Sequence, residues 1–552
     1  MNRKSLYIPA ILIGKIALIF LILYFNVGMY GFDAYIHRQY VDSIIQNNQI
    51  IEVNIAKSYY DFVGFHVFAS AISLLTGLNT EIIYEFISVI IPILIFDLSV
   101  IAFIRQVEKK KRGYIPNEIN LQYFSLILLY PAIIGIQMFL GRPNSLGIGL
   151  FSLCVYLYLC KPESFRSQII AGFLAIVTVE VHHLSALFLL PVIFITSIFL
   201  AKNYKSILSL IYAIPAVIIV RTILNSREFE IVNYYLSQNE TYETLFNIFI
   251  KNEFSFLALW VIITLIGFII RRIYGKRISE FFSKRRFTKY FLAFIIGAII
   301  LVEIIGLFIY SANLPSWYIT VELIIIVLLS GIALFFPDNV KYALFALGFC
   351  FYGLTVVFSL TFSSTEHELS WLAPRTFIFT LIFIGLLAYL SISSLLKTLR
   401  RRWIPILLSI LLFNSYLSIN YLGKQYLPGY NLTNDYQNIT FANSMQSYVN
   451  MTLYNNSMSV PFSISKYIEG IDIYRVPLLL DANSSMEQNR IRLISTHLRF
   501  IVIGVTMDQW LGTPLILSSS NLSYYLNSLY ITLPTFHLVI SNGKNYLLYH
   551  VW

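Results

Sequence analysis

Ionisable side chains recur at the ends of apolar segments in this chain, beginning directly after the apolar run 6–30. Asp33 is the first of them, in the stretch YGFDAYIHRQY. A carboxylate held near an acceptor hydroxyl can take its proton, so Asp33 is a candidate general base. The other interpretation is that Asp33 caps the helix that follows, by accepting a backbone N–H group. Charged groups at membrane depth are costly, and a set of them at one level favours a functional role.

Two arginines stand at similar positions later in the chain. Arg142 lies in a short turn between two apolar segments, and Arg375 starts a segment just after Pro374. A guanidinium presents a fixed fork of donors that suits phosphate, so both are candidate phosphate ligands. The alternatives are a side chain that reaches from the bilayer to its surface, for Arg142, and a structural anchor, for Arg375.

The pair His182-His183 marks a further polar break, together with Glu180 and Ser185. Adjacent residues on a helix point about 100° apart and rarely bind one metal ion together. We therefore expect hydrogen bonding or phosphate binding from this pair, and no metal site.

The composition predicts a polytopic membrane protein. Of 552 residues, 57% are hydrophobic and only 12% are charged, and the mean hydropathy is +0.72. The net charge of +11 does not indicate nucleic-acid binding, because the basic residues cluster between apolar segments. The cysteines Cys154, Cys160 and Cys350 fall inside predicted spans. We expect them to be buried, with neither a disulfide nor a metal cluster.

At about 20 residues per span, the sequence accommodates about thirteen transmembrane helices. Their predicted ranges are 6–30, 82–104, 120–140, 143–160, 168–182, 184–201, 206–223, 252–270, 290–311, 317–336, 342–362, 375–396 and 403–420. Residues 34–47 form an amphipathic pattern, with Tyr40 on the apolar side and His37, Arg38 and Asp42 on the polar side. We expect this helix, and the short apolar segment 59–78, to lie along the membrane surface.

Two patterns predict the orientation. Most of the 39 Lys and Arg residues fall on one side of the predicted layout, which places the N-terminus in the cytoplasm. The N-x-S/T sequons all fall on the other side, at Asn239, Asn431, Asn438, Asn450, Asn455, Asn483 and Asn521. Any one of them could occur by chance in a sequence rich in Asn and Ser. The prediction is an integral protein of the plasma membrane whose C-terminal domain is extracytoplasmic.

The predicted organisation has two domains. Residues 1–420 form the transmembrane domain, with the first outer loop at 31–81 and its surface helices. Residues 421–552 form a small mixed α/β domain. In it, 490–496 and 498–505 are expected strands, and 536–551 is an expected hairpin that turns on Asn542-Gly543, a pair typical of type I′ turns.

This combination resembles the GT-C superfamily of membrane glycosyltransferases, especially the branch of protein mannosyltransferases and aminoarabinose transferases. The segments LRFIVIGV and ISNGKNYLLYHV are similar to strands common in archaeal relatives. Members have an acidic residue just after the first span, matched by Asp33, followed by surface helices, matched by 34–47 and by YYDFVGFHVFA. They continue with many spans and often an outer C-terminal domain. Many relatives carry an Asp in the turn after the third span, where this chain has Asn144 in GRPNS. The sequence WWDYG is absent, which argues against an oligosaccharyltransferase catalytic subunit.

The resemblance implies a sugar donor linked to polyprenyl or dolichyl phosphate and an acceptor that is a glycan, lipid or protein of the cell envelope. Asp33 would be the catalytic base, and Arg142, Arg375, His182 and His183 would contact the donor phosphate. The candidates for acceptor or sugar binding are His37, Arg38, Asp42, His66, Asn144, Glu366 and His367. The scheme requires no cofactor and no metal, and the missing second acid puts a bridging divalent ion in doubt.

Two other classes of protein fit the same composition. A transporter or lipid flippase is also polytopic, but should show repeated halves and charges near the bilayer midplane, whereas this chain has its charges at span ends. A non-catalytic relative that binds envelope polymers is favoured by the missing second acid. The position of Asp33 relative to a cavity distinguishes this last class from an enzyme.

Overall fold

The computed structural model describes part of the chain in detail. The described residues are 13, 16–17, 31–50, 62–112, 143–162, 164–197, 206–224, 226, 326–327, 329–330, 339–362 and 372–398, with seven strands between 458 and 550. The chain divides into two compact units. The first comprises Met1–Phe25, Tyr40–Glu52 and Ser58–Leu422, and the second comprises Asn26–Gln39, Val53–Lys57 and Gly423–Trp552.

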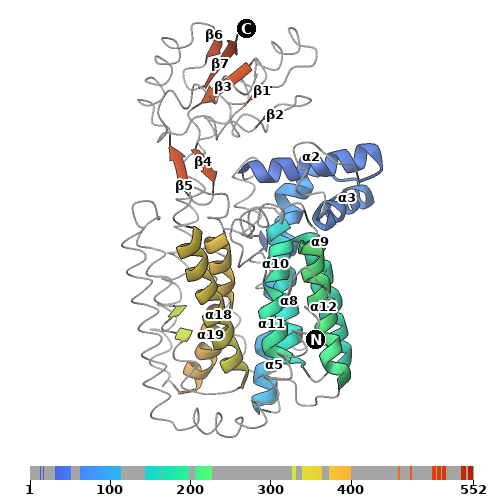
Figure 1. The fold of residues 1–552 in the computed structure, drawn as a ribbon, viewed down its shortest axis with the longest axis vertical. Coiled ribbons are helices and arrows are strands. Elements are labelled where there is room, and N and C mark those ends of the chain that lie inside the picture. The colour runs from blue at the N-terminus through green and yellow to red at the C-terminus, as the bar shows by residue number, and fades with distance from the viewer. Residues whose placement is uncertain are drawn as a thin grey trace, which may run out of the picture. The chain divides into compact units, whose positions relative to one another are not determined.

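The first unit is helical throughout its described residues, and Figure 1 shows its long helices running side by side. The helices are α3 (Gly64–Thr76), α4 (Thr80–Ile82), the π-helical turn η3 (Ile83–Ile87), α5 (Ser88–Arg112), α8 (Pro143–Cys160), α9 (Phe165–Val181), α10 (His183–Leu187), α11 (Leu189–Ile195), α12 (Ser206–Leu224), α18 (Asn339–Phe362) and α19 (Leu372–Thr398). The helix α2 (Gly31–Asn47) belongs to both units. The segments 88–107 and 143–160 are long and apolar enough to cross a membrane.

Several predicted spans correspond to these helices. The span 143–160 coincides with α8, and the spans 168–182, 206–223, 342–362 and 375–396 match α9, α12, α18 and α19 within a few residues. The span 82–104 begins with η3 and continues as α5. The predicted spans 6–30, 120–140, 252–270, 290–311, 317–336 and 403–420 lie wholly or largely outside the described residues.

The predicted span 184–201 corresponds in its described part to the apolar helical segment His183–Ile195. An irregularity at Phe188, which keeps helical backbone angles, separates α10 from α11. Pro191 gives the physical reason, because it has no N–H for the carbonyl group of residue 187 and its ring crowds that carbonyl. The Phe188 N–H instead donates to the Leu184 carbonyl at 3.0 Å and ends α10.

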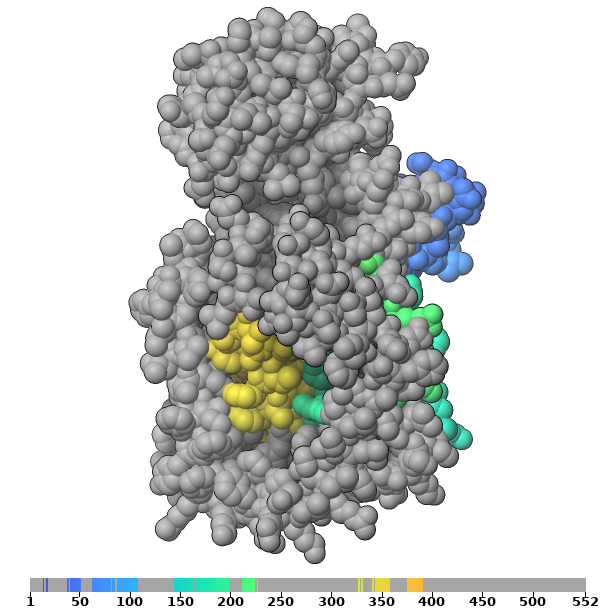
Figure 2. Space-filling model, viewed as in Figure 1, coloured from blue at the N-terminus to red at the C-terminus, as the bar shows by residue number. Residues whose placement is uncertain are grey.

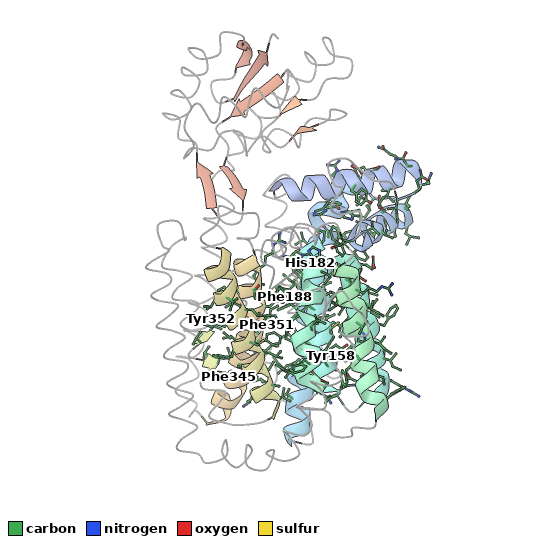
Figure 3. All side chains as sticks on the ribbon, viewed as in Figure 1. Tyr158, His182, Phe188, Phe345, Phe351 and Tyr352 are labelled. Carbon is green, nitrogen blue, oxygen red and sulfur yellow. The ribbon has the colours of Figure 1, made fainter. Side chains whose placement is uncertain are left out.

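Five buried phenylalanine rings join α8, the α10–α11 break, α18 and α19. Phe379 of α19 packs edge-on against Phe151 of α8, with ring centroids 4.7 Å apart, and lies 4.6 Å from Phe188. Phe351 of α18 stacks on Phe383 at 5.4 Å and packs against Phe188 at 5.6 Å. Figure 3 shows Phe188 and Phe351 facing each other between the two groups of helices. We call these five residues the phenylalanine cluster.

The helices bury small and polar residues together with large apolar ones, and they also expose large apolar residues on their outer surfaces. On α9 the buried positions include Gln168, Ala171 and Thr178, whereas Phe173 is 66% exposed. On α18, Phe349 is more than half exposed, and Figure 2 shows atoms of α18, in yellow, at the molecular surface. Soluble proteins rarely expose large contiguous apolar surfaces, whereas helices in lipid do so routinely.

The second unit contains a five-stranded mixed sheet in the order β2-β1-β3-β7-β6. Its strands are β1 (Met458–Ser459), β2 (Ile473–Tyr474), β3 (Phe500–Gly504), β6 (Phe536–Ser541) and β7 (Asn545–His550). β1 is parallel to β2 and β3, and β7 is antiparallel to β3 and β6. The strands β4 (Met507–Trp510) and β5 (Thr513–Ile516) form a separate antiparallel pair.

The predicted strand at 498–505 is confirmed as β3, and the predicted hairpin over 536–551 is confirmed as β6 and β7. A pairing irregularity between Leu538 and Ile540 interrupts the hairpin. Its turn on Asn542-Gly543, and the predicted strand 490–496, lie outside the described residues.

The phenylalanine cluster generates a stability prediction. Phe351→Ala should lower the free energy of unfolding by about 3 kcal/mol, because it leaves a cavity among rings that cannot fully collapse. The matched control is Phe349→Ala on the same helix, which removes an exposed ring and should change stability by less than about 1 kcal/mol. Unfolding of the purified protein in detergent measures both. Equal losses for the two variants would contradict the cluster's role.

Candidate functional site

The candidate site lies where the ends of α3, α8, α9 and α10 meet. Contacts between these helices bring together segments that are far apart in the sequence. We call this region the histidine junction and define it by His66, His182 and His183 with the residues packed directly on them. Figure 3 shows His182 at the end of the α8–α9–α10 group that lies near α3.

His182 forms the joint between α9 and α10. Its N–H donates to the Thr178 carbonyl at 2.8 Å and closes α9, and its carbonyl accepts the Ala186 N–H at 3.2 Å and opens α10. Its backbone is extended, with φ −161° and ψ 101°. The side chain also participates, because Nδ1 accepts the Ser185 N–H at 3.2 Å and lies 2.7 Å from the Ser185 Oγ. The imidazole is therefore the N-cap of α10, a position that Ser, Thr, Asp or Asn usually occupies.

The turn at His182 packs directly on the backbone of α8. A Cβ atom built on Gly147 would lie 2.7 Å from the His182 Cβ and 2.7 Å from the Ser185 Oγ. Carbon atoms do not approach this closely, so only glycine fits at position 147. Asn144, one turn earlier on α8, is also buried. Ser185 is fully buried.

A second close approach fixes α3 against the end of α9. A Cβ atom on Gly64 would lie 2.9 Å from the carbonyl carbon and oxygen of Glu180. Just before α3, the Phe62 ring stacks on the His183 ring, with centroids 4.5 Å apart and planes 29° apart. The His182 and His183 rings lie 5.5 Å apart. His183 is thus held between an aromatic ring and its neighbouring imidazole.

His66 enters the junction from α3 and is completely buried. The Tyr40 ring of α2 packs edge-on against it at 4.6 Å, and the Phe65 ring lies 5.9 Å away. The Ser70 hydroxyl donates to the His66 carbonyl at 2.7 Å. Tyr40 is itself fully buried, so this contact ties α2 to α3 within the first unit.

The structure places some of the predicted site residues near one another. Of the predicted site residues, His66, His182 and His183 lie at the junction, and Asn144 lies on the same end of α8. Arg375 is half-buried in the first turns of α19, one turn before Phe379 of the phenylalanine cluster. Arg142, Glu366 and His367 lie outside the described residues.

The helix α2 differs from the sequence prediction at Asp33 and at His37. It begins at Gly31, so Asp33 already lies inside the helix and is not its N-cap. His37 was expected on the polar side, but it is only 2% exposed. Positions 37, 40 and 41 follow the i, i+3, i+4 spacing of one helix face, and Tyr40 and Val41 are buried as well. Arg38 and Asp42 are half-buried.

Sequence reasoning missed the residues that hold the junction together. Gly147 and Gly64 are important because they have no side chain, which allows another segment to approach their backbone closely. A single sequence does not reveal such a contact. Ser185 marked the polar break, but nothing indicated that its N–H would bond to an imidazole. The Gly at the fifth position of α8, in PNSLGIG, is the one signal that could have suggested a close helix contact.

The junction offers imidazole and hydroxyl groups next to aromatic faces. Among the described residues, no group of three or more His, Cys, Asp or Glu side chains is arranged to hold a metal ion. The Nδ1 atom of His182 is bonded to Ser185, which leaves this nitrogen engaged within the protein. The arrangement suits recognition of a polar group by imidazole donors and stacking of a flat or apolar surface on Phe62 and His183.

Comparisons with known proteins complete the description. No protein-family model and no curated protein matches the chain. Among solved structures, the chain is similar to the Archaeoglobus fulgidus oligosaccharyltransferase, crystallised with a disulfide-tethered acceptor peptide that contains an NVT sequon. The TM-score is 0.47 and the identity is 12%, and the match covers 100% of this chain and 74% of the other.

The contact at Gly147 generates a second stability prediction. Gly147→Ala should destabilise the protein by about 1–3 kcal/mol, because the added methyl group overlaps His182 and Ser185. Gly353→Ala on α18 is the matched control, since nothing lies within 4 Å of its Cβ position. That control should be neutral or slightly stabilising, because alanine favours the helix. Thermal unfolding compares the two, and an undiminished melting temperature for Gly147→Ala would refute the close approach.

Proposed function

We propose that this protein is a GT-C-type glycosyltransferase of the plasma membrane, with its N-terminus cytoplasmic and residues 421–552 extracytoplasmic. It would move a sugar from a polyprenyl- or dolichyl-phosphate donor to a glycan, lipid or protein acceptor on the outer face. The observation that carries the proposal is that the start of α3, which bears His66, packs on the α9–α10 turn that bears His182 and His183. These residues come from separate segments, and the sequence had placed all of them at the outer leaflet.

The reaction would be a single inverting displacement. The acceptor oxygen would attack the anomeric carbon, and its bond to that carbon would form as the bond from carbon to the phosphate oxygen breaks. The bonding electrons would leave with the lipid phosphate, and the acceptor proton would pass to Asp33. Arg142 and Arg375, with His182 and His183, would stabilise the charge on the departing phosphate. The scheme needs no metal.

The helix α2 supports the role given to Asp33. Positions 33, 37 and 40 are spaced i, i+4 and i+7, so they share one side of a continuous helix. Tyr40, the last of these, contacts His66 of the junction. The side of α2 that carries position 33 is therefore the side that contributes a residue to the junction. His37, Arg38 and Asp42, on the same helix, would bind the acceptor or the sugar, with Glu366 and His367.

The helix α3 supports a site at a lipid surface. It turns His66, Ser70 and Ser73 inward, whereas Leu74 is 62% and Leu75 is 87% exposed. A helix that buries its polar side chains in protein and presents leucines outward is suited to lie against acyl chains. Such a helix would hold the junction at the depth where a lipid-linked donor presents its phosphate.

Loss of the base should abolish transfer. We expect membranes with Asp33→Asn to transfer radiolabelled sugar at least about 100-fold more slowly than wild type at matched protein levels, tested with a panel of polyprenyl-phosphate sugars. Asp508→Asn, in the strand β4, is the control and should transfer normally. Equal rates for wild type and Asp33→Asn would rule out Asp33 as the base. Absence of transfer by wild type with every donor would count against the proposed function.

The exposed end of α3 can be tested separately from activity. An environment-sensitive fluorophore on Leu75→Cys in liposomes should emit at shorter wavelength and be quenched by lipids that carry a nitroxide on the acyl chain. The same fluorophore on Gln49→Cys, an exposed polar position just after α2, should be quenched less. A water-like emission from both positions would show that α3 does not lie against lipid.

A further inference from the structure

The donors that meet His182 determine which of its nitrogens carries a proton. The Ser185 N–H donates to Nδ1, and a backbone amide can only donate. Nδ1 must therefore have its lone pair available. The Ser185 Oγ, 2.7 Å from the same atom, then donates its hydroxyl proton to Nδ1 as well. In a neutral imidazole with an acceptor at Nδ1, the proton resides on Nε2.

We propose that Ser185 is a positioning residue that holds His182 as the neutral imidazole with its proton on Nε2. The same contact is the N-cap of α10. Formation of this helix end and selection of the Nε2-protonated tautomer are therefore coupled. A protonated imidazole would place an Nδ1–H group against the Ser185 N–H group, with two donors facing each other. The cap therefore opposes the imidazolium form as well as the other neutral tautomer.

The surroundings restrict the ring further. Gly147 leaves no room for the His182 Cβ and Cγ to move toward α8, since a Cβ atom at 147 would lie 2.7 and 3.2 Å from them. The His183 ring lies 5.5 Å from the His182 ring. His182 is 7% exposed and Ser185 is fully buried, so water does not readily replace these donors.

This inference deepens the proposed function and rests on it for its chemical consequence. At a glycosyl-transfer site, a neutral Nε2–H group donates a hydrogen bond to a phosphate oxygen and cannot act as a base. The proton from the acceptor is then left to the carboxylate of Asp33. His182 stabilises charge on the leaving group without exchanging a proton with it.

The tautomer can be measured without any substrate. In protein labelled with ¹⁵N-histidine, the two ring nitrogens of a neutral imidazole give distinct signals for the protonated and unprotonated atom. Comparison with His182→Asn identifies the His182 signals. We expect a protonated Nε2 and an unprotonated Nδ1 at neutral pH. A protonated Nδ1, in either the other tautomer or the imidazolium, would overturn the inference.

Two variants of Ser185 test its own part. Ser185→Ala keeps the N–H donor, 3.2 Å from Nδ1, but removes the closer hydroxyl donor at 2.7 Å. We expect the Nε2–H tautomer to remain the major form, with a measurable fraction protonated on Nδ1. Ser185→Thr retains both donors and should restore the wild-type pattern. The Ala variant should lower kcat with little change in KM, since it leaves every substrate contact in place. A wild-type spectrum for Ser185→Ala would show that the hydroxyl does not position the ring.

Two variants of His182 separate the cap from the donor. Asparagine is a good N-cap whose oxygen can replace Nδ1, but it has no donor at the Nε2 position. Glutamine reaches the Nε2 position with an amide N–H group, but caps poorly. We expect His182→Asn to fold well and lose at least about tenfold in kcat/KM, and His182→Gln to retain more activity at lower stability. Full activity of His182→Asn would overturn the donor role.

Ser164→Ala is the matched control for cap loss. Ser164 caps α9 by accepting the Ser167 N–H, far from the junction in the helix, so its loss should lower stability with no effect on transfer. The two proposals fail differently. A wild type that transfers no sugar but shows the expected tautomer refutes the proposed function alone. A wild type that transfers sugar with a protonated Nδ1 refutes the positioning role alone.

Discussion

The contact between the α8 backbone at Gly147 and the turn at His182 is the constraint on which the junction depends. It brings the side chains of His182 and Ser185 directly against the α8 backbone, because Gly147 has no side chain of its own. Because the turn consists of one extended residue, α10 begins immediately and descends beside α8. The contact of α3 with Glu180 and the stack of Phe62 on His183 then build on a fixed surface.

The interior of the helical unit shows how such a fold is stabilised when its outside is apolar. Buried positions carry Ser, Thr and small residues whose hydroxyl groups bond to carbonyls one turn earlier, as Thr178 does to Leu174. Apolarity alone does not distinguish the inside from the outside, since α9 has rings such as Phe173 exposed whereas the phenylalanine cluster is buried. Close packing of backbones and the interlocked rings of the phenylalanine cluster supply the specificity. The same helices that position the junction therefore depend on shape complementarity more than on exclusion of water.

Much of the helical layout could be predicted from the sequence, because apolar segments of about 20 residues and polar breaks are strong local signals. The polar break at His182, where α9 ends, followed from the same signals. The break at Phe188 was missed, although Pro191 was visible, because a proline in the first turn of a helix and one in its interior look alike in sequence. The burial of His37 was missed because a histidine reads as polar, whereas its place beside Tyr40 is set by helical spacing. The close contacts at Gly64 and Gly147 depend on the shape of the segment packed against each glycine, which no local sequence pattern encodes.

The one-residue joint at His182 also links two distant parts of the unit through chain length. Adding or removing a residue there would rotate α10 by about 100° and shift it by about 1.5 Å along its axis. Phe188, six residues later, would then leave its place among Phe351 and Phe379. The number of residues between His182 and Phe188 therefore fixes the position of the polar junction relative to the phenylalanine cluster. Homologous chains that keep both features can vary in loops elsewhere, but are expected to conserve the number of residues between them.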